Sequence, residues 1–332
     1  MSHQVKATVI AHSISSVTGQ EMITFELEFP RIVLAEFNTH NALSKNTSSS
    51  RAIPVKSMNE KILEDIGMPV RFGAKNAGMQ DNGEHNEPIL IGGSLMSPRE
   101  AWAAAVETMV WFSEKFEAAG YAKQVCNRLT ECGQIVKVVC TATDLANYYW
   151  LRDHFMADPT IANLASKMKY AHKHSNPVTL NPGDWHVPYY NDGVWKAHKE
   201  LEVHPVIVVD LFGHSLQNAL DISASCCAQA SYRKLDDTIE KARSVVERLN
   251  LGVDLTEPCH ASPTEHQGTP VDKSYTNDPS DDTDGVNLIH PCTWQEGITH
   301  MTREGVFGSG NLKNYIQYRQ LIPGNVYTGG AA

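Results

Sequence analysis

Two stretches near the start of the chain decide its fold class: Val5-Lys6-Ala7-Thr8-Val9-Ile10 and Ile23-Thr24-Phe25-Glu26-Leu27-Glu28-Phe29. Apolar and polar side chains alternate along both stretches, and a period of two residues is typical of β-strands. A polar turn rich in Ser, Thr and Gly separates them between Ser15 and Gln20. We therefore predict an antiparallel β-hairpin in this part of the chain.

Strand-like and helix-like segments follow one another along the rest of the chain. Ser97-Pro98-Arg99-Glu100 has the spacing of a capping box, and the apolar residues after it recur at helical spacing until Gly120. The other predicted elements are a strand at 135–140, a helix capped by Thr143, a second helix that starts at Asp158-Pro159, a strand at 206–209, and helices at 215–232 and 236–249. We expect loops at 38–50 and 267–297. The alternation predicts an α/β fold.

Composition and charge exclude several classes of protein. The 332 residues include 28 Lys and Arg against 38 Asp and Glu, a net charge of −10. This charge argues against extended binding to polymeric nucleic acid or to an acidic membrane surface. No apolar stretch approaches the roughly 20 residues that span a membrane. Because there is no secretion signal and the seven cysteines form no CxxC pair, we expect free thiols and a cytoplasmic location.

One polar segment is the best candidate for a binding loop: Thr39-His40-Asn41-Ala42-Leu43-Ser44-Lys45-Asn46-Thr47-Ser48-Ser49-Ser50-Arg51. Small side chains let the backbone approach a ligand closely, and hydroxyl and backbone N–H groups donate hydrogen bonds to anionic oxygens. Arg51 adds a bidentate donor that suits phosphate. The segment indicates a phosphate site, and a Ser/Thr-rich surface turn is the alternative that the segment alone leaves open.

The same residues resemble the fingerprint of a known family, the flavin-dependent thymidylate synthases. That fingerprint reads R-H-R-x-x-S-x-N-x-x-S-x-R-Y, and the matching positions here are His40, Ser44, Asn46, Ser49 and Arg51. The approach to the fingerprint is also similar, because Thr24-Phe25, Pro30 and Ala35 fit the strand that precedes it in the family.

Later segments extend the resemblance over residues 22–266, in pieces. Asn127-Arg128-Leu129 and the run 141–152, which contains Asn147 and Arg152, are similar to further family elements, and Ala157–Ile161 follows as in the family. The segment Cys259–His266 looks like the family's H-x-[ST]-P-F-E-H flavin segment, and residues 228–232 are similar to A-R-V-S-Y. This block precedes the fingerprint in the family and follows it here. The chain thus resembles a permuted member, of the kind associated with bacteriophages.

The resemblance implies an architecture. It implies one catalytic domain over residues 1–332, with an antiparallel or mixed sheet, long flanking helices and segments in permuted order. Residues 1–175 would hold the fingerprint loop and a helical half, and residues 200–332 a permuted flavin-segment half with the loop 267–297. It further implies a homotetramer with sites between subunits, in the host cytoplasm if the chain is phage-encoded.

The resemblance also implies a reaction. dUMP would be methylated at C5 to dTMP, with 5,10-methylenetetrahydrofolate as carbon donor, FAD as hydride carrier, NADPH as reductant and no metal. Catalysis would rest on Ser49, Arg51 and Arg152. The residues implied for dUMP are Ser49, Ser50, Arg51, Arg128 and Arg152. Those implied for FAD and folate are His40, Ser44, Asn46, Asn147, His260, Ser262 and Glu265.

Departures from the fingerprint keep other activities open. Thr39 and Asn41 stand where the family has two arginines, and Thr143 replaces another. Arg319, in a segment similar to the family's Q-W-x-R, is a candidate to restore one cation. One alternative is a flavin-dependent enzyme that hydroxymethylates or otherwise modifies C5 of another pyrimidine nucleotide. Another is a nucleotide-binding homologue that has lost catalysis.

Three motifs offer rival interpretations. Pro258-Cys259-His260 matches the nucleophile motif of the covalent thymidylate synthases, although the flavin segment explains the same residues better. His172, His174 and the adjacent Cys226-Cys227 are candidate zinc ligands, but no pair of ligand spacings recurs, so we favour core or surface roles. The acidic run 277–285 resembles the start of a calcium loop whose twelfth position is Pro291 instead of Glu, which favours a solvated loop.

Overall fold

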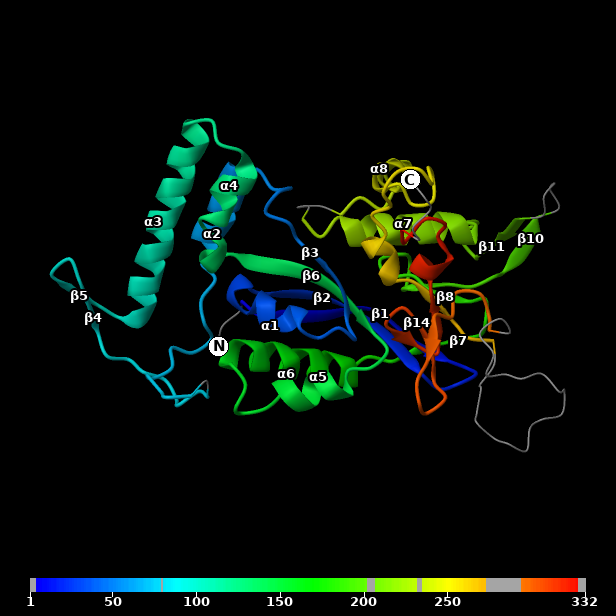
Figure 1. The fold of residues 1–332 in the computed structure, drawn as a ribbon, viewed down its shortest axis with the longest axis horizontal. Coiled ribbons are helices and arrows are strands. Elements are labelled where there is room, and N and C mark those ends of the chain that lie inside the picture. The colour runs from blue at the N-terminus through cyan, green and yellow to red at the C-terminus, as the bar shows by residue number, and fades with distance from the viewer. Residues whose placement is uncertain (1–3, 79, 202–206, 232–234, 273–293, 328–332) are drawn as a thin grey trace.

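The structure, a computed structural model, describes residues 4–78, 80–201, 207–231, 235–272 and 294–327. At its centre lies a five-stranded sheet in the order β3-β6-β2-β1-β7 (Figure 1). Its strands are β1 (Lys6–Ser15), β2 (Glu21–Pro30), β3 (Ser44–Thr47), β6 (Ile135–Ala142) and β7 (Val178–Leu180). β1, β2, β6 and β3 pair antiparallel, whereas β7 runs parallel to β1. The chain is therefore an α/β protein with a mixed sheet.

The predicted hairpin is confirmed and supplies the middle of this sheet. β1 and β2 pair in a register that joins Lys6 to Glu28 and Ile14 to Glu21. Phe25, Leu27 and Phe29, at alternate positions of β2, are fully buried in the main core. Each such side chain contributes about 1.5–3 kcal/mol when it leaves water. The period of two residues thus reports which face of the hairpin is buried.

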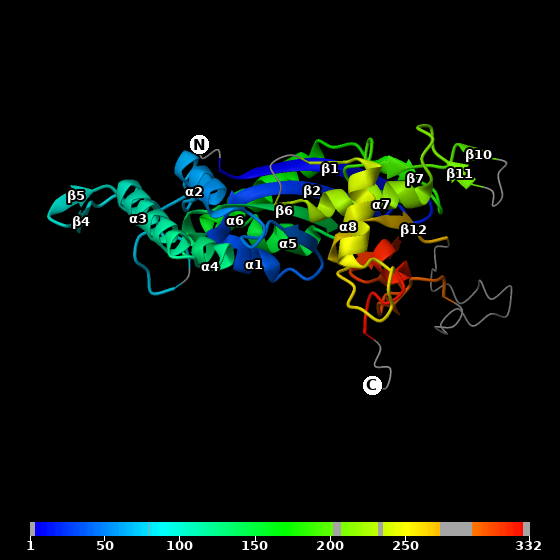
Figure 2. The same cartoon turned by 90° about the horizontal axis from the view of Figure 1, so that it is seen from above.

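Three helices cover the main core: α1 (Leu34–Asn38), α5 (Ala146–Arg152) and α6 (Pro159–Lys173). As predicted, Asp158 caps α6, and its carboxylate accepts hydrogen bonds from the backbone N–H groups of Thr160 and Ile161. The apolar face of α6 is fully buried through Ile161, Leu164, Ala165 and Met168. Figures 1 and 2 show α5 and α6 side by side along the sheet.

A smaller helical lobe lies beyond one end of the sheet (Figure 1). It contains α2 (Val55–Glu64), α3 (Pro98–Ala118), α4 (Lys123–Arg128), and the hairpin of β4 (Ile89–Ile91) and β5 (Ser94–Met96). The capping box at Ser97 and Glu100 is present, as predicted. The lobe has its own small core of Ile53, Met58, Ile62, Val106 and Val110.

The remaining elements form two further sheets, one strand pair and two packed helices. The four-stranded sheet is β16-β12-β8-β9, the three-stranded sheet is β13-β14-β15, and β10 pairs with β11. The strands are β8 (Trp185–His186), β9 (Val194–Trp195), β10 (Lys199–Leu201), β11 (Ile207–Val209), β12 (Gly268–Pro270), β13 (His300–Met301), β14 (Phe307–Ser309), β15 (Leu312–Lys313) and β16 (Tyr315–Gln317). The helices are α7 (Leu216–Ala228) and α8 (Ile239–Leu249). The 3-10 turns among the described residues are η1 (Arg31–Val33), η2 (Glu131–Gly133), η3 (Ser262–Glu265) and η5 (Tyr318–Leu321).

Several predicted boundaries need correction. The expected loop 38–50 contains β3, because residues 44–47 pair with β6, and the expected loop 267–297 begins with β12. Thr143 does not cap α5: its hydroxyl accepts from the backbone N–H of Lys313, and α5 starts at Ala146. The helices predicted at 215–232 and 236–249 are α7 and α8, which are shorter. Val206 and the acidic run 277–285 lie outside the described residues.

Two further expectations concern the cysteines and membrane-spanning helices. The six cysteines of the described part of the chain are free thiols. None of the described helices combines the length and the apolar character needed to cross a membrane.

Candidate functional site

The fingerprint segment is held between the main sheet and α7. It runs from α1 through β3, where Ser44 pairs with Thr141 and Thr47 with Val138 of β6. Beyond the strand, the backbone N–H of Ser49 donates to the hydroxyl of Ser231 at 2.7 Å. The amide Nδ2 of Asn46 donates to the carbonyl of Cys227 at 3.5 Å. The segment that resembles the fingerprint therefore contacts the segment that resembles A-R-V-S-Y.

The segment that resembles the flavin motif lies next to β3. Its residues 262–265 form η3, which packs against β3, α7 and η5. Pro263 and Thr264 are buried, and the Thr264 hydroxyl donates to the carbonyl of Ala261 at 2.6 Å. Ser262 is left exposed and Glu265 half-buried. Two motifs far apart in the sequence thus meet at one place in the fold.

A cavity of about 650 Å³ opens where these segments meet. It is lined by Asn38, Asn41, Leu43, Lys45, Asn46, Thr47, Ser262, Glu265, Gly310, Asn311, Gln317, Arg319 and Gln320. The wall is predominantly polar and combines amide groups with two cations and a carboxylate. A volume of this order suits a small organic ligand or the ring system of a cofactor.

Hydrogen bonds fix the polar groups of this wall. Asn311 Oδ1 accepts from the Ser44 hydroxyl and from Gln317 Nε2, each at 2.9 Å. Gln317 Nε2 also donates to the carbonyl of Glu265 at 3.1 Å, and the Glu265 carboxylate forms an ion pair with Arg319. This network ties β3, η3 and the segment around β16 together. The cavity is therefore a preorganised polar site.

Lys45 brings a partly desolvated cation to the cavity. Its Nζ donates to the carbonyls of His40 at 2.7 Å and of Asn38 at 3.3 Å, and it lies 5.7 Å from the centre of the Phe37 ring. Burial lowers the pKa of Lys45, while nearby Cys140 and Glu265 oppose the shift. A cation held by neutral carbonyls retains charge to offer an anionic ligand.

His40 and Arg152, two predicted site residues from different elements, are brought together. Arg152 Nε donates to His40 Nε2 at 2.9 Å, and the His40 ring packs edge-on against Tyr148 at 4.9 Å between centroids. Burial lowers the pKa of His40, and the charges of Arg152 and Lys45 lower it further. A neutral imidazole that accepts from Arg152 fits this pair.

The predicted residues fall into separate groups. Ser44, Asn46, Ser262 and Glu265 lie at the cavity, and His40 lies between its lining residues Asn38 and Asn41. Ser49, Ser50 and Arg51 follow β3 and lie outside the cavity lining, as do Arg128, Asn147 and His260, which are exposed on α4, on α5 and before η3.

The turn that carries Arg51 is fixed by α4. The buried amide Nδ2 of Asn127 donates to the carbonyls of Ser50 at 2.8 Å and of Ile53 at 2.9 Å. Arg51 is exposed on this turn, and Arg128 is exposed on the helix that holds it. The two arginines are therefore carried by a common rigid support rather than by the cavity wall.

Sequence reasoning missed several lining residues. Lys45 lies inside the fingerprint, at a position that the motif leaves free. Asn311, Gln317 and Gln320 come from the C-terminal part of the chain. Asn311 lies outside every motif considered above. Arg319, the candidate to restore a cation, does line the cavity and pairs with Glu265.

Covalent catalysis by Cys259 and zinc binding by the Cys226-Cys227 pair gain little from the structure. Cys259 is partly buried before η3, and it is absent from the cavity lining. Burial raises the pKa of the Cys226 thiol to about 12, and that of Cys227 also rises well above its usual value. Zinc binds the thiolate form, which burial disfavours. His174 stacks on Tyr170 at 4.0 Å between centroids, whereas His172 faces other partners.

Comparison with known proteins gave no family assignment. No family model matches the chain, and no curated protein matches it. Among solved structures, one match is the crystal structure of flavin dependent thymidylate synthase ThyX from Helicobacter pylori complexed with FAD and dUMP. The alignment has 15% sequence identity and a TM-score of 0.30, and it covers 46% of this chain and 67% of that chain. A TM-score this low does not establish a common fold, so the assignment of function rests on the site itself.

Proposed function

We propose that this chain is a flavin-dependent enzyme that methylates dUMP at C5, with 5,10-methylenetetrahydrofolate as carbon donor and NADPH as reductant. The observation that carries the proposal is the meeting of two motif-bearing segments at one polar cavity. Asn46, from the fingerprint, and Ser262 and Glu265, from the flavin segment, line the same wall. Convergence in space of two independently recognised motifs supports a shared ligand.

The donor set of the cavity fits the ligands that the proposal needs. Uracil and the isoalloxazine ring of FAD share an edge with two carbonyls and one N–H, and side-chain amides match such an edge because each offers a donor and an acceptor. Asn46, Asn311 and Gln317 supply these amides. Lys45 and Arg319 supply cations for anionic oxygens. Bound FAD would supply hydride transfer, which no side chain can perform.

In this scheme the chain's own residues bind and orient. Asn46 would hold a ring edge in register, and Gln317 would fix the orientation of Asn311 beside it. Lys45 would stabilise negative charge on a ring carbonyl or phosphate. Arg51 and Arg128 would hold the nucleotide phosphate from the turn beyond β3, and Arg152 would position His40. We keep Ser49 and Ser50 as hydroxyl donors of the same turn, and Asn147 and His260 as contacts to FAD or folate.

The first test is the visible absorption spectrum of the purified protein, reconstituted with FAD, before and after addition of dUMP. We expect bound flavin whose bands shift with dUMP. Lys45→Met should weaken dUMP binding at least about tenfold, because a charge-assisted hydrogen bond contributes about 1.5–3 kcal/mol. The matched control is Lys75→Met, at an exposed position, and it should bind dUMP as tightly as the wild type. No bound flavin under any condition would overturn the proposal and leave a nucleotide-binding protein.

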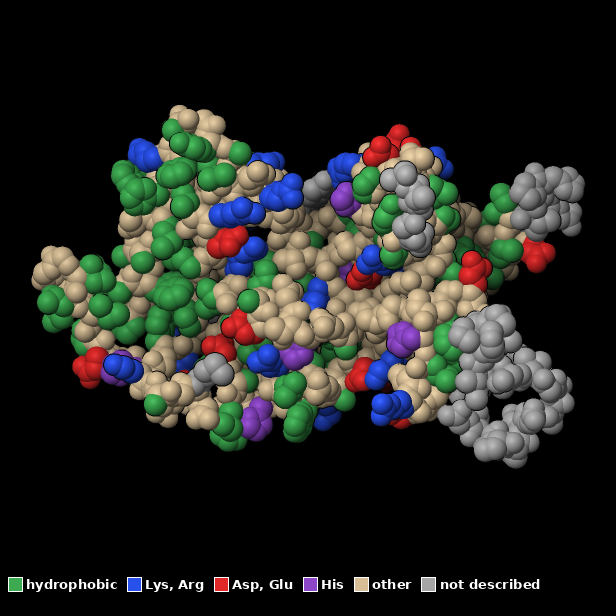
Figure 3. Space-filling model, viewed as in Figure 1, with side chains coloured by type: hydrophobic (Ala, Val, Ile, Leu, Met, Phe, Trp, Pro, Cys, Tyr) green, Lys and Arg blue, Asp and Glu red, His purple; other side chains and the backbone are tan. Residues whose placement is uncertain are grey.

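We further propose that the chain self-associates, as the homotetramer of the resembling family implies. Exposed apolar side chains gather on α3 and on the β4–β5 hairpin, at the left of Figure 3. They include Leu90, Leu95, Met109, Trp111 and Phe112, of which Leu90 and Leu95 are 69% and 71% exposed. A contiguous apolar surface of this kind is typical of an interface between protein chains.

Light scattering coupled to size-exclusion chromatography tests the association. We expect the wild type to elute as an assembly larger than one chain and Trp111→Arg to shift it towards the monomer, because a buried charge without a partner opposes association. Val253→Arg, on an exposed loop elsewhere, should leave the assembly intact. A monomeric wild type would contradict the proposal.

A further inference from the structure

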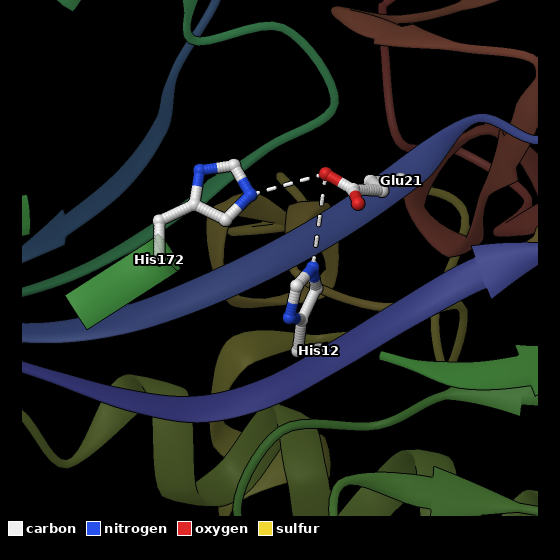
Figure 4. A group of neighbouring side chains, drawn as sticks. All are labelled: His12, Glu21 and His172. Carbon is white, nitrogen blue, oxygen red and sulfur yellow. Dashed lines mark hydrogen bonds and ion pairs between the residues drawn. The ribbon is translucent and has the colours of Figure 1, made fainter. Parts of the chain in front are cut away.

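We propose that His12, Glu21 and His172 form a binding site for a divalent transition-metal ion of the zinc class. The three side chains come from β1, from the start of β2 and from the last turn of α6, and they point toward one another in Figure 4. One ligand atom from each residue lies within 4.8 Å of the other two. Two imidazoles with one carboxylate are a recurring donor set for zinc with an open coordination position.

The distances between the donor atoms are close to those of a metal site. Glu21 Oε2 lies 3.1 Å from His172 Nε2 and 3.9 Å from His12 Nε2. Tetrahedral coordination at about 2.0–2.1 Å from the metal places neighbouring ligand atoms about 3.3–3.4 Å apart. Glu21 is 43% exposed in its side chain and can therefore move to shorten its distance to His12.

The outer hydrogen bonds direct Nε2 of both histidines inward. His12 Nδ1 lies 3.0 Å from the Ser175 hydroxyl, and His172 Nδ1 lies 3.4 Å from the Tyr149 hydroxyl. Partners of this kind fix ring orientation in metal sites, where the nitrogen away from the metal bonds to a second group. Both Nε2 atoms are thus left for the shared position beside Glu21.

A buried ring nitrogen without a hydrogen-bond partner is the second observation that points to a ligand. The side chain of His12 is only 4% exposed, and its Nε2 makes no hydrogen bond. A buried polar atom without a partner carries a cost in free energy that native proteins usually avoid. A cation at this point would satisfy the orphaned nitrogen.

The site faces a cavity of its own. A second cavity of about 400 Å³ is lined by Glu21 and His172, together with Gln20, Thr143, Asp144 and Tyr149. It shares none of its lining residues with the larger cavity beside β3. Solvent or a small ligand can therefore reach Glu21 and His172 from this cavity. The inference does not depend on the proposed flavin chemistry.

Titration of the metal-free protein with Co²⁺ and with Zn²⁺ tests the site. We expect visible ligand-field bands on cobalt binding, and retention of one zinc ion per chain in equilibrium dialysis. Glu21→Gln and His172→Gln should each weaken zinc binding by about tenfold or more, and Ser175→Ala, which removes an outer partner, by about tenfold. His174→Gln, a neighbouring histidine stacked on Tyr170, is the matched control and should bind like the wild type.

The contrary result is equally clear. If cobalt gives no ligand-field bands, or if zinc binds Glu21→Gln as tightly as the wild type, the three side chains form only a hydrogen-bonded cluster and the proposal is wrong. Circular dichroism establishes that each variant is folded. Because Glu21 and His172 are partly exposed, their substitution leaves the core unchanged, and Ser175→Ala gives an independent measure.

Discussion

Truncation of Phe37 to alanine should lower the free energy of unfolding by about 3–5 kcal/mol, the range for large aromatic side chains removed from a core. Phe37 is fully buried on α1 and packs edge-on against Phe29 at 5.4 Å and Tyr148 at 5.9 Å between ring centroids. These neighbours belong to β2 and α5, so the cavity left behind is walled by elements that cannot easily collapse into it. Urea denaturation followed by circular dichroism measures the change.

The exposed Phe155 provides a matched control for this substitution. Its ring is 82% exposed, so Phe155→Ala should change the free energy of unfolding by no more than about 0.5 kcal/mol. Because the ammonium of Lys45 lies over the Phe37 ring, Phe37→Ala should also weaken ligand binding in the adjacent cavity. A loss of stability below about 1 kcal/mol would show that α1 is not part of the main core.

The elements with a strong local pattern could be predicted from sequence. Phe25, Leu27 and Phe29 alternate because one face of β2 is buried, and Ser97 with Glu100 starts α3 through its own capping groups. These signals are local: the residues that carry them also form the element. The hairpin, α3 and α6 were therefore predicted correctly from composition and spacing alone.

Two strands could not be predicted because distant partners create them. Residues 44–47, Ser-Lys-Asn-Thr, have little intrinsic preference for extended structure, and they are a strand only because β6 offers an edge. Residues 268–270, Gly-Thr-Pro, pair with β16, almost fifty residues later in the chain. Glycine and proline are poor strand formers, so pairing between distant segments overrides local propensity here.

The residues of the candidate site also form two groups, those that belong to sequence motifs and those that only the fold brings together. Asn46, Ser262 and Glu265 belong to motifs, and all three line one cavity. Asn311 and Gln317 reach the cavity through the three-dimensional path of the C-terminal strands, which no spacing encodes. His12 approaches His172 and Glu21 only because β1 lies beside β2 and α6 crosses them. Sequence can nominate chemically suited residues, but only the fold decides which of them share a site.

A buried polar chain links the main sheet to the flavin-like segment. His266, which follows Glu265, places Nδ1 2.8 Å from the Thr141 hydroxyl, and Thr141 lies 2.7 Å from the Thr24 hydroxyl. Thr24 in turn lies 2.8 Å from Nε2 of His186. Both histidines are completely buried, and desolvation lowers the pKa of each to about 3. Burial of the two histidines stabilises the folded state only while both imidazoles are neutral.

Acidification from pH 7 to pH 5 should therefore lower the free energy of unfolding, and these two histidines should together account for about 4 kcal/mol of the loss, about 2 kcal/mol each. The sign follows from proton uptake: in this window the unfolded state, with histidine pKa values near 6.5, binds protons that the folded state excludes. Stability is complete above about pH 6.5 and falls as the pH drops towards 3. Urea denaturation at a series of pH values measures the slope.

Removal of one titrating group should reduce this dependence. His266→Gln keeps a side chain able to bond to Thr141 but cannot take up a proton, so stability should fall by about 2 kcal/mol less than in the wild type over the same interval. His154→Gln, at an exposed position outside this hydrogen-bonded network, is the matched control. An unchanged slope in His266→Gln would mean that His266 is hydrated in solution.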